Sequence, residues 1–379
     1  MIVKNVEKKE KNTAAFQVET DAAEFEAAVN GAYLKNKSSI YIPGFRKGKA
    51  PRAVVEGMYG AEVFYQDAMD ELAPKAFELG LKESGLRIVG APAISDVNVT
   101  DERTVAYTFE VTLYPEVTLG QYKGLSAAKD AVNVTDEDVE KELQEVLKRN
   151  ARILTVDDRE AQMGDTANID FDGYLDGERF DGGKAVVFKV KLNSLSAKEL
   201  PALDDEFAKD VSEFDTLEEY KADIRAKQEK QQQEQAENKF RSDIMRQACD
   251  NMTVEIPEVM IEDKLEEIVR NYAANFGFTD RKTSLQDLLN MMGVDAAAIR
   301  PSAEMQVKTE LLLEAVAAAE NAEITEEETE AYLKRVAEGI GAQPEDIKNY
   351  FSKEFIEEEM KKERATNAII ESAVEAKAE

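Results

Sequence analysis

A cluster of basic residues without a single acidic one interrupts this strongly acidic chain. The 379 residues carry a formal net charge of -30. Between residues 35 and 55, however, all the charged side chains are cations: Lys35, Lys37, Arg46, Lys47, Lys49 and Arg52. Such cations can contact phosphate groups or acidic side chains. The cluster therefore predicts a docking site for an anionic surface on a chain that would otherwise repel one.

The centre of this cluster, residues 42–51, has the composition of an exposed turn. Two prolines and two glycines disfavour both a helix and a strand interior: Pro43, Gly44, Gly48 and Pro51. We expect them to hold Phe45, Arg46 and Lys47 out from the body, so that Phe45 can enter an apolar cleft while the cations position it. The alternative is an ordinary solvated loop with scattered lysines.

Methionine is the second candidate for binding chemistry. Seven of the eleven methionines follow residue 240: Met245, Met252, Met260, Met291, Met292, Met305 and Met360. Because the side chain is flexible and polarizable, a surface rich in methionine can accept apolar partners of many shapes. The alternative for each of them is ordinary core packing.

A third group consists of carboxylates in a β-rich segment: Asp170, Asp172, Asp176 and Asp181. Paired carboxylates suggest acid chemistry or calcium, but the EF-hand spacing and its final glutamate are absent. We interpret these residues as turn residues. The chain has no histidine and one cysteine, Cys249, which excludes histidine-dependent triads, ordinary zinc sites and an intramolecular disulfide. It also lacks a P-loop sequence, and we expect neither a metal nor a cofactor.

Length and composition indicate a multi-domain protein. At 379 residues, two or three domains are expected. No run approaches 18 apolar residues, and the start at Met1 favours a strand over a signal peptide, so we expect a cytoplasmic protein without membrane contact.

The N-terminal part should be an α+β domain. We expect two strands within residues 1–20, a helix over 21–37, a second helical stretch through Phe77, and strands over 88–99 and 104–114. Residues 115–129 are interpreted as an extended linker. A capping-box pattern at Thr135 predicts a helix to Asn150.

The remainder divides into a β segment and a helical array. Residues 156–195 show short strands with Asp-Gly turns, and from Thr216 the pattern is helical to the end. Residues 226–239 are almost wholly polar, which predicts a helix that projects as an arm. Further helix starts are expected at four positions: Pro257, Thr325, Pro344 and Phe355.

The residues 44–51, Gly-Phe-Arg-Lys-Gly-Lys-Ala-Pro, resemble the signature of the trigger factor family, bacterial chaperones that associate with the ribosome. Residues 199–208 resemble the segment by which these proteins leave their isomerase domain. The resemblance implies a ribosome contact through the loop residues Gly44, Phe45, Arg46, Lys47, Gly48, Lys49 and Pro51. It also implies contacts to client polypeptides, for which we select Met260, Met291, Met292 and Met305.

The β segment resembles only part of an FKBP-type prolyl isomerase. Residues 164–183 are similar to its first half and residues 186–192 to its last strand. The resemblance places four residues on the family's proline pocket: Phe171, Phe180, Asp181 and Phe188. The central strand, the pocket floor and the loop with a pocket tyrosine have no counterpart, so we expect no isomerase activity. A natural loss, an engineered deletion and an omission of that part from the given chain would all leave the same sequence.

The resemblance implies an ATP-independent chaperone that docks at the large ribosomal subunit near the exit tunnel, through ribosomal protein and rRNA, and shelters nascent chains. It further implies links to protein transport and cell division, and a homodimer off the ribosome. Two alternatives are an FKBP-type isomerase with docking domains and a ribosome-binding factor without client activity. The expected domains are a ribosome-binding domain (1–115), a linker and helix that packs on the C-terminal body (116–150), a truncated FKBP-like segment (151–195) and a helical body with arms (196–379).

Overall fold

The computed structural model describes residues 1–100, 103–175, 178–179, 187–280, 282–321 and 324–376, with only the backbone described between 172 and 189. The chain forms two compact units. The first combines Met1–Ser126 with Ile244–Val374, and the second contains Ala127–Asp243 with the end of the chain. Both α-helices and β-sheets are present, and the expected α+β class with a helical C-terminal array is confirmed.

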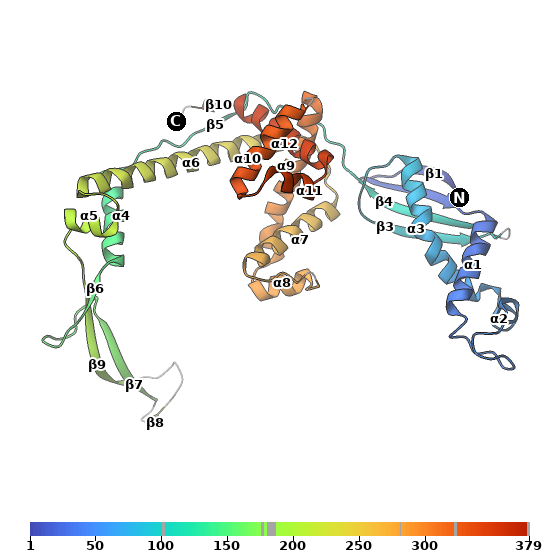
Figure 1. Cartoon of the computed structure of the whole chain (residues 1–379), viewed down its shortest axis with the longest axis horizontal. Helices are drawn as coiled ribbons and strands as arrows, with labels where there is room; N and C mark the ends of the chain where they lie inside the picture. Colours follow the sequence, from blue (N-terminus) through green and yellow to red (C-terminus); the bar gives the residue numbers. More distant parts are fainter. Residues whose placement is uncertain (101–102, 176–177, 180–186, 281, 322–323, 377–379) are drawn as a thin grey trace. The chain divides into compact units, whose positions relative to one another are not determined.

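The N-terminal domain in the first unit contains a four-stranded antiparallel sheet with the order β1-β2-β4-β3. Helix α3 lies across one face of this sheet, and α1 packs beside α3 (Figure 1). The expected strands and first helix are confirmed. The elements are β1 (Ile2–Lys8), β2 (Thr13–Glu19), α1 (Ala22–Asn36), α2 (Arg52–Tyr59), the 3-10 helix η1 (Ala61–Phe64), α3 (Tyr65–Ser84), β3 (Ile88–Val99) and β4 (Val105–Leu113).

Alternation along the two central strands builds the core of this domain. Every second residue of β2 and β4 is buried, and Phe16 of β2 is the register partner of Phe109 of β4. Their ring centres lie 5.4 Å apart, and Phe77 of α3 lies over both rings. This aromatic cluster fixes α3, and with it the chain on either side of the basic loop.

The C-terminal helices of the first unit form two small cores. The first joins α7, α8 and α9 around Leu265 and Leu288, and the second joins α10, α11 and α12 around Leu333 and Met360. Helix α12 begins two residues before the expected Phe355, because the Ser352 side chain accepts a hydrogen bond from the Phe355 amide and caps it. The bounds are α7 (Glu258–Asn275), α8 (Leu285–Met292), α9 (Ala296–Glu320), α10 (Glu326–Ile340), α11 (Pro344–Tyr350) and α12 (Lys353–Glu371).

The second unit has a compact helical base. Val139 and Leu143 of α4 (Asp136–Arg149) pack against Ile224 of α6. The helix α6 (Leu217–Asn251) is continuous. Lys239 in its polar stretch forms an ion pair with Asp130, which precedes α4, at 2.7 Å. Helix α5 (Asp205–Val211) was not predicted from the sequence. Two short strands lie near the boundary of the units, β5 (Ser126–Ala128) and β10 (Val374–Ala376).

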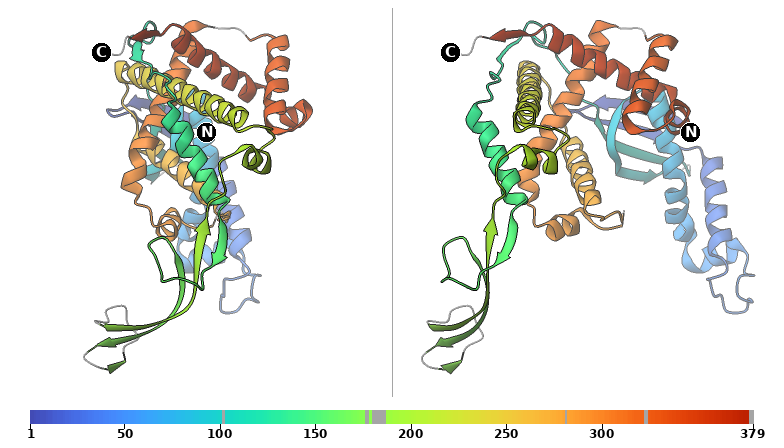
Figure 2. Two further views of the ribbon diagram at one scale, coloured as in Figure 1. Left: turned by 90° about the vertical axis from the view of Figure 1, so that its left-hand side faces the viewer. Right: turned by 60° about the vertical axis from the view of Figure 1, so that its left-hand side comes forward.

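A narrow antiparallel sheet extends from this base, with the order β6-β9-β7-β8. Strands β7 and β9 run side by side in both views of Figure 2. Strand β9 reaches Glu199, seven residues beyond the expected end at Leu192. The bounds are β6 (Arg152–Thr155), β7 (Thr166–Leu175), β8 (Glu178–Arg179) and β9 (Val187–Glu199).

Candidate docking loop and client-binding surface

Two consecutive turns shape the basic loop. In the first, the Phe45 amide donates to the Ile42 carbonyl at 3.1 Å, with Pro43 and Gly44 between them. Gly44 has a φ of +88°, the left-handed value that the third residue of a type II turn requires. Proline before glycine therefore specifies this turn from the sequence alone.

The second turn follows at once. The Lys49 amide donates to the Arg46 carbonyl at 2.9 Å, and Gly48 takes a φ of +76°. A Cβ at Gly48 would lie 3.5 Å from the Lys37 carbonyl oxygen, an ordinary contact, so the need for glycine here is conformational.

Both ends of the loop are anchored in the domain. Ile42 and Ala50 are buried members of the N-terminal core. The Tyr33 hydroxyl of α1 donates to the Ala50 carbonyl at 2.9 Å. Pro51 then precedes the first residue of α2, where its fixed φ suits the start of a helix. The loop is therefore a rigid projection with buried ends.

The tip presents an aromatic ring and cations to solvent. Phe45 is 40% exposed, and Arg46, Lys47 and Lys49 are exposed as well. Within the described ranges, none of these three cations forms an ion pair. Arg52 differs, because it donates to Glu26 at 2.6 Å and to Glu56 at 2.5 Å. Of the six cations in the cluster, Arg52 thus has a structural role.

Exposed apolar residues near the loop were missed by the sequence reasoning. Tyr41 directly precedes the buried Ile42, and Met58 and Tyr59 end α2; all three are more than half exposed. The Tyr59 hydroxyl donates to the Tyr41 carbonyl at 3.4 Å, which brings the two segments together. Large apolar residues directly beside the turn residues were the available signal.

The selected methionines differ in exposure. Met291 at the end of α8 is 57% exposed. Met260, Met292 and Met305 are half-buried, and Met292 packs against the core of α7, α8 and α9. Of the four methionines, Met291 is therefore the one with a largely exposed side chain.

Exposed aromatic pairs on the C-terminal helices are additional candidates. Tyr272 and Phe276 lie on the outer side of α7, with ring centres 5.1 Å apart. Phe351 and Phe355 stack at 5.0 Å where α12 begins. The spacing of four residues could have found Tyr272 and Phe276, because such residues share one side of a helix. It does not account for the second pair, because Phe351 is extended and precedes the start of α12 at Lys353.

The positions that resemble a proline pocket are only partly described. Phe171 lies on β7 and is 64% exposed. Phe188 pairs with Gly173 through the backbone of the β7–β9 ladder. The predicted positions Phe180 and Asp181 lie outside the described residues.

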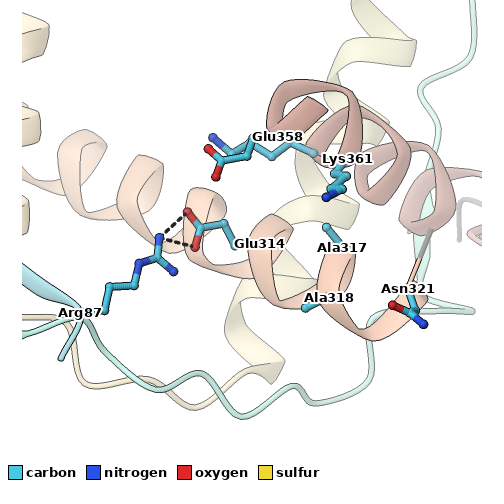
Figure 3. Close-up of a pocket in the computed structure, with 8 residues that line it drawn as sticks. Arg87, Glu314, Ala317, Ala318, Asn321, Glu358 and Lys361 are labelled. Atoms are coloured by element: carbon cyan, nitrogen blue, oxygen red, sulfur yellow. Dashed lines mark hydrogen bonds and ion pairs between the residues drawn. The ribbon is translucent and has the colours of Figure 1, made fainter. Parts of the chain in front are cut away.

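One cavity of about 440 Å³ lies between the chain before β3 and helices α9 and α12 (Figure 3). Glu314 accepts hydrogen bonds there from Arg87 at 3.3 Å and from the Tyr114 hydroxyl at 2.9 Å. Burial and this hydrogen bond raise the pKa of Tyr114. Arg87, Tyr114 and Glu314 thus satisfy one another, and we assign these three groups a structural role.

The described residues contain neither a metal-binding cluster nor a membrane-spanning helix. No group of three or more acidic or cysteine side chains is arranged to hold a metal ion among them. None of the helices traced in the described ranges combines the length and apolar character needed to cross a bilayer.

Two family models match the N-terminal and the C-terminal part of the chain. Residues 2–146 match the family described as bacterial trigger factor protein, and residues 216–371 match the family of its C-terminus. The trigger factor of Acetivibrio thermocellus is 38% identical, with 94% of this chain and 95% of the relative covered. That of Clostridioides difficile is 35% identical, with 97% and 98% covered.

A solved structure supports the fold. It is titled "Promiscuous Substrate Recognition in Folding and Assembly Activities of the Trigger Factor Chaperone" and matches with a TM-score of 0.50 over 98% of this chain and 99% of its own, at 18% identity. The two alignments above extend over 409 and 421 positions, more than this chain's whole length, so both relatives contain residues that have no counterpart here. The resemblance drawn from residues 44–51 and 199–208 is confirmed, and the chain belongs to the trigger factor family.

Proposed function

We propose that this chain is an ATP-independent chaperone that docks beside the ribosomal exit tunnel through residues 42–51 and shelters polypeptides as they emerge. Membership in the trigger factor family supports the chaperone role. The finer contacts, to ribosomal protein and rRNA of the large subunit, are part of the proposal, as are a cytoplasmic location and a homodimer away from the ribosome.

The exposed loop tip is the observation that carries the docking proposal. Three exposed cations, which form no ion pair with any described residue, follow Phe45 within four positions on a chain with a net charge of -30. An anionic ribonucleoprotein surface attracts this tip and repels the acidic remainder, which orients the encounter. Phe45 then adds apolar contact in a cleft, while the cations position it.

Co-sedimentation with ribosomes tests this proposal. We expect the triple variant Phe45→Ala, Arg46→Ala, Lys47→Ala to bind at least about tenfold more weakly with an unchanged circular dichroism spectrum, because its side chains lie outside the core. The control variant, Lys227→Ala with Lys230→Ala, removes the same number of positive charges, two, from the exposed side of α6. Equal binding by the triple variant and the control would exclude the loop as the docking site.

Client binding is proposed for the exposed apolar residues of the C-terminal helices. Met291 and the pairs Tyr272–Phe276 and Phe351–Phe355 are dispersed over α7, α8 and the start of α12. Dispersed apolar sites can hold unfolded chains of different sequence, since no single contact has to be made. Met260, Met292 and Met305 remain part of this proposed surface through their half-exposed side chains.

Suppression of aggregation measures this second part. Changing the four aromatic residues together to serine should greatly reduce protection of a denatured test protein without ATP, whereas Met291→Ala or Met305→Ala alone should have a small effect. The control changes Tyr41 and Met58, which are equally exposed but lie in the N-terminal domain. Full protection by the fourfold variant would move the client surface elsewhere.

A further inference from the structure

Three exposed side chains beside the docking loop form an apolar surface, called the apolar shelf below. Tyr41 is 68% exposed, Met58 56% and Tyr59 57%. The Tyr59 hydroxyl donates to the Tyr41 carbonyl at 3.4 Å, which joins the chain before the loop to the end of α2. Large apolar side chains that gather on a surface indicate an interaction site, whereas single scattered ones do not.

The apolar shelf belongs to the same rigid end of the N-terminal domain as the loop (Figure 1). Tyr33 of α1 holds both parts. Its hydroxyl donates to the Ala50 carbonyl at the end of the loop, and its ring packs against the buried Phe64, five residues after Tyr59, with ring centres 5.7 Å apart. A body that contacts the loop therefore meets the apolar shelf at a fixed position, and neither part has to be ordered on binding.

The charges along α2 select the kind of occupant. Residues 53–63 contain no cation and two carboxylates, Glu56, which pairs with Arg52 at 2.5 Å, and Glu62. A base of RNA brings its phosphate with it, and phosphate requires cations close to the stacked base, so RNA is the poorer occupant. Tyrosine and methionine are instead enriched in interfaces between proteins. A second copy of this chain is disfavoured, because each copy carries a charge of -30.

We propose that the apolar shelf binds an apolar patch of a ribosomal protein, beside the anionic surface that the loop contacts. This inference rests on the proposed docking function and adds a second kind of contact to it. The cations of the loop tip contact phosphate or carboxylate groups, and the apolar shelf contributes contact area that involves no charge. Removing the apolar shelf therefore lowers affinity without changing the ionic part of binding.

Ribosome binding by the full chain at several salt concentrations tests this proposal. We expect the shelf variant, Tyr41→Ser with Met58→Ser and Tyr59→Ser, to bind about tenfold more weakly than the wild type. Its slope of log K against log salt should be unchanged, because an apolar contact releases no counterions.

The control variant changes three exposed apolar residues on the sheet of the same domain to serine: Ile2, Ile94 and Val97. It should bind ribosomes as the wild type does. Equal binding by the shelf variant and the control overturns the proposal, and so does a shelf variant with an altered salt slope, which would indicate an ionic contact.

Photocrosslinking identifies the occupant without removing the whole shelf. A benzophenone amino acid at position 58, in an otherwise unchanged chain, should crosslink to a ribosomal protein on irradiation with ribosomes. Absence of that protein crosslink overturns the proposal, whether the probe reacts with RNA, with a second copy of the chain or with neither.

The loop variant separates this inference from the docking function on which it rests. If Phe45→Ala with Arg46→Ala and Lys47→Ala binds ribosomes like the wild type, the docking function of the loop is wrong. If that variant loses binding while the shelf variant retains it, the docking function stands and the apolar shelf alone is excluded.

Discussion

Among single residues, two glycines in helices of the N-terminal domain show how the surroundings decide the effect of one methyl group. A Cβ at Gly80 of α3 would overlap the Phe16 ring and lie 2.9 Å from Val18 Cγ2. Gly57 of α2 has no heavy atom within 4 Å of the same position. Helix α3 can approach β2 only because residue 80 lacks a side chain.

We therefore predict opposite effects of the same substitution. Gly80→Ala should lower the free energy of unfolding of the domain by about 1–3 kcal/mol through overpacking, in spite of a better helix propensity. Gly57→Ala should raise it by about 0.5–1 kcal/mol. Hydrogen exchange of the β2 amides under native conditions measures both. A stabilising Gly80→Ala would mean that α3 does not contact β2 so closely.

Asp165 gives a prediction for pH. Its carboxylate accepts two hydrogen bonds from Arg159, at 2.7 and 2.9 Å, and one from the Gln162 amide at 2.8 Å. These bonds lower the pKa of Asp165 from 3.8 to about 2. Since the folded-state pKa is depressed, the contribution to the order of this loop is complete above pH 3.8 and is lost as the pH falls toward 2.

A carbon-detected NMR titration of Asp165 measures this. We expect a midpoint near 2 in the wild type and a rise toward 3.8 in Arg159→Gln, which removes the charged partner. An unchanged midpoint in the variant would attribute the shift to the Gln162 amide.

For whole elements, periodic and capped segments were predictable and short ones were not. Thr135 and Thr325 form the capping boxes that the sequence indicated. Helix α5 was missed because its seven residues bury only Phe207 and Ala208, too few to show a helical period. The loop turns followed from proline and glycine alone, whereas exposure of Met291 depends on which neighbouring helices cover it, and that is set by tertiary packing.

The sheet formed by β7 and β9 also yields a prediction about catalysis. An FKBP-type site must enclose the proline ring to lower a barrier of roughly 18–20 kcal/mol. Of the four positions that resemble the proline pocket, Phe171 is the one whose side chain the structure describes. It is 64% exposed and cannot enclose a ligand by itself. We expect the chain to leave the isomerisation rate of a proline tetrapeptide unchanged in an NMR exchange assay, beside a complete FKBP-type enzyme as positive control. Acceleration that is lost in Phe171→Ala would contradict this.

The whole molecule combines a cationic tip with a large negative charge. Salt weakens the attraction of the tip for an anionic surface and also screens the repulsion of the remainder. The attraction of the tip and the repulsion of the remainder change binding in opposite directions as salt rises. The salt dependence of the binding constant therefore measures which of them is larger.

We expect the attraction of the tip to dominate because the tip is the part in contact, so ribosome binding should weaken as salt rises from 50 to 200 mM in the wild type. In Arg46→Ala with Lys47→Ala, the slope of log K against log salt should be less negative by about 2, one for each lost phosphate-type contact. Binding isotherms at four salt concentrations give both slopes. Parallel slopes would show that the tip does not meet phosphate or carboxylate groups.

The pairing of Arg152 with Glu199 brings the two ends of the β insert together on neighbouring strands. Helix α4 precedes β6 and helix α5 follows β9, so the pairing of these two strands connects the two helices directly. Because β6 and β9 hold the two ends of the insert together, we expect the length of the chain between them to have little effect on the helical base. The two family matches, residues 2–146 and 216–371, lie on either side of this insert. Residues 152 and 199 are therefore the positions between which we expect another segment to be inserted with the helical base retained.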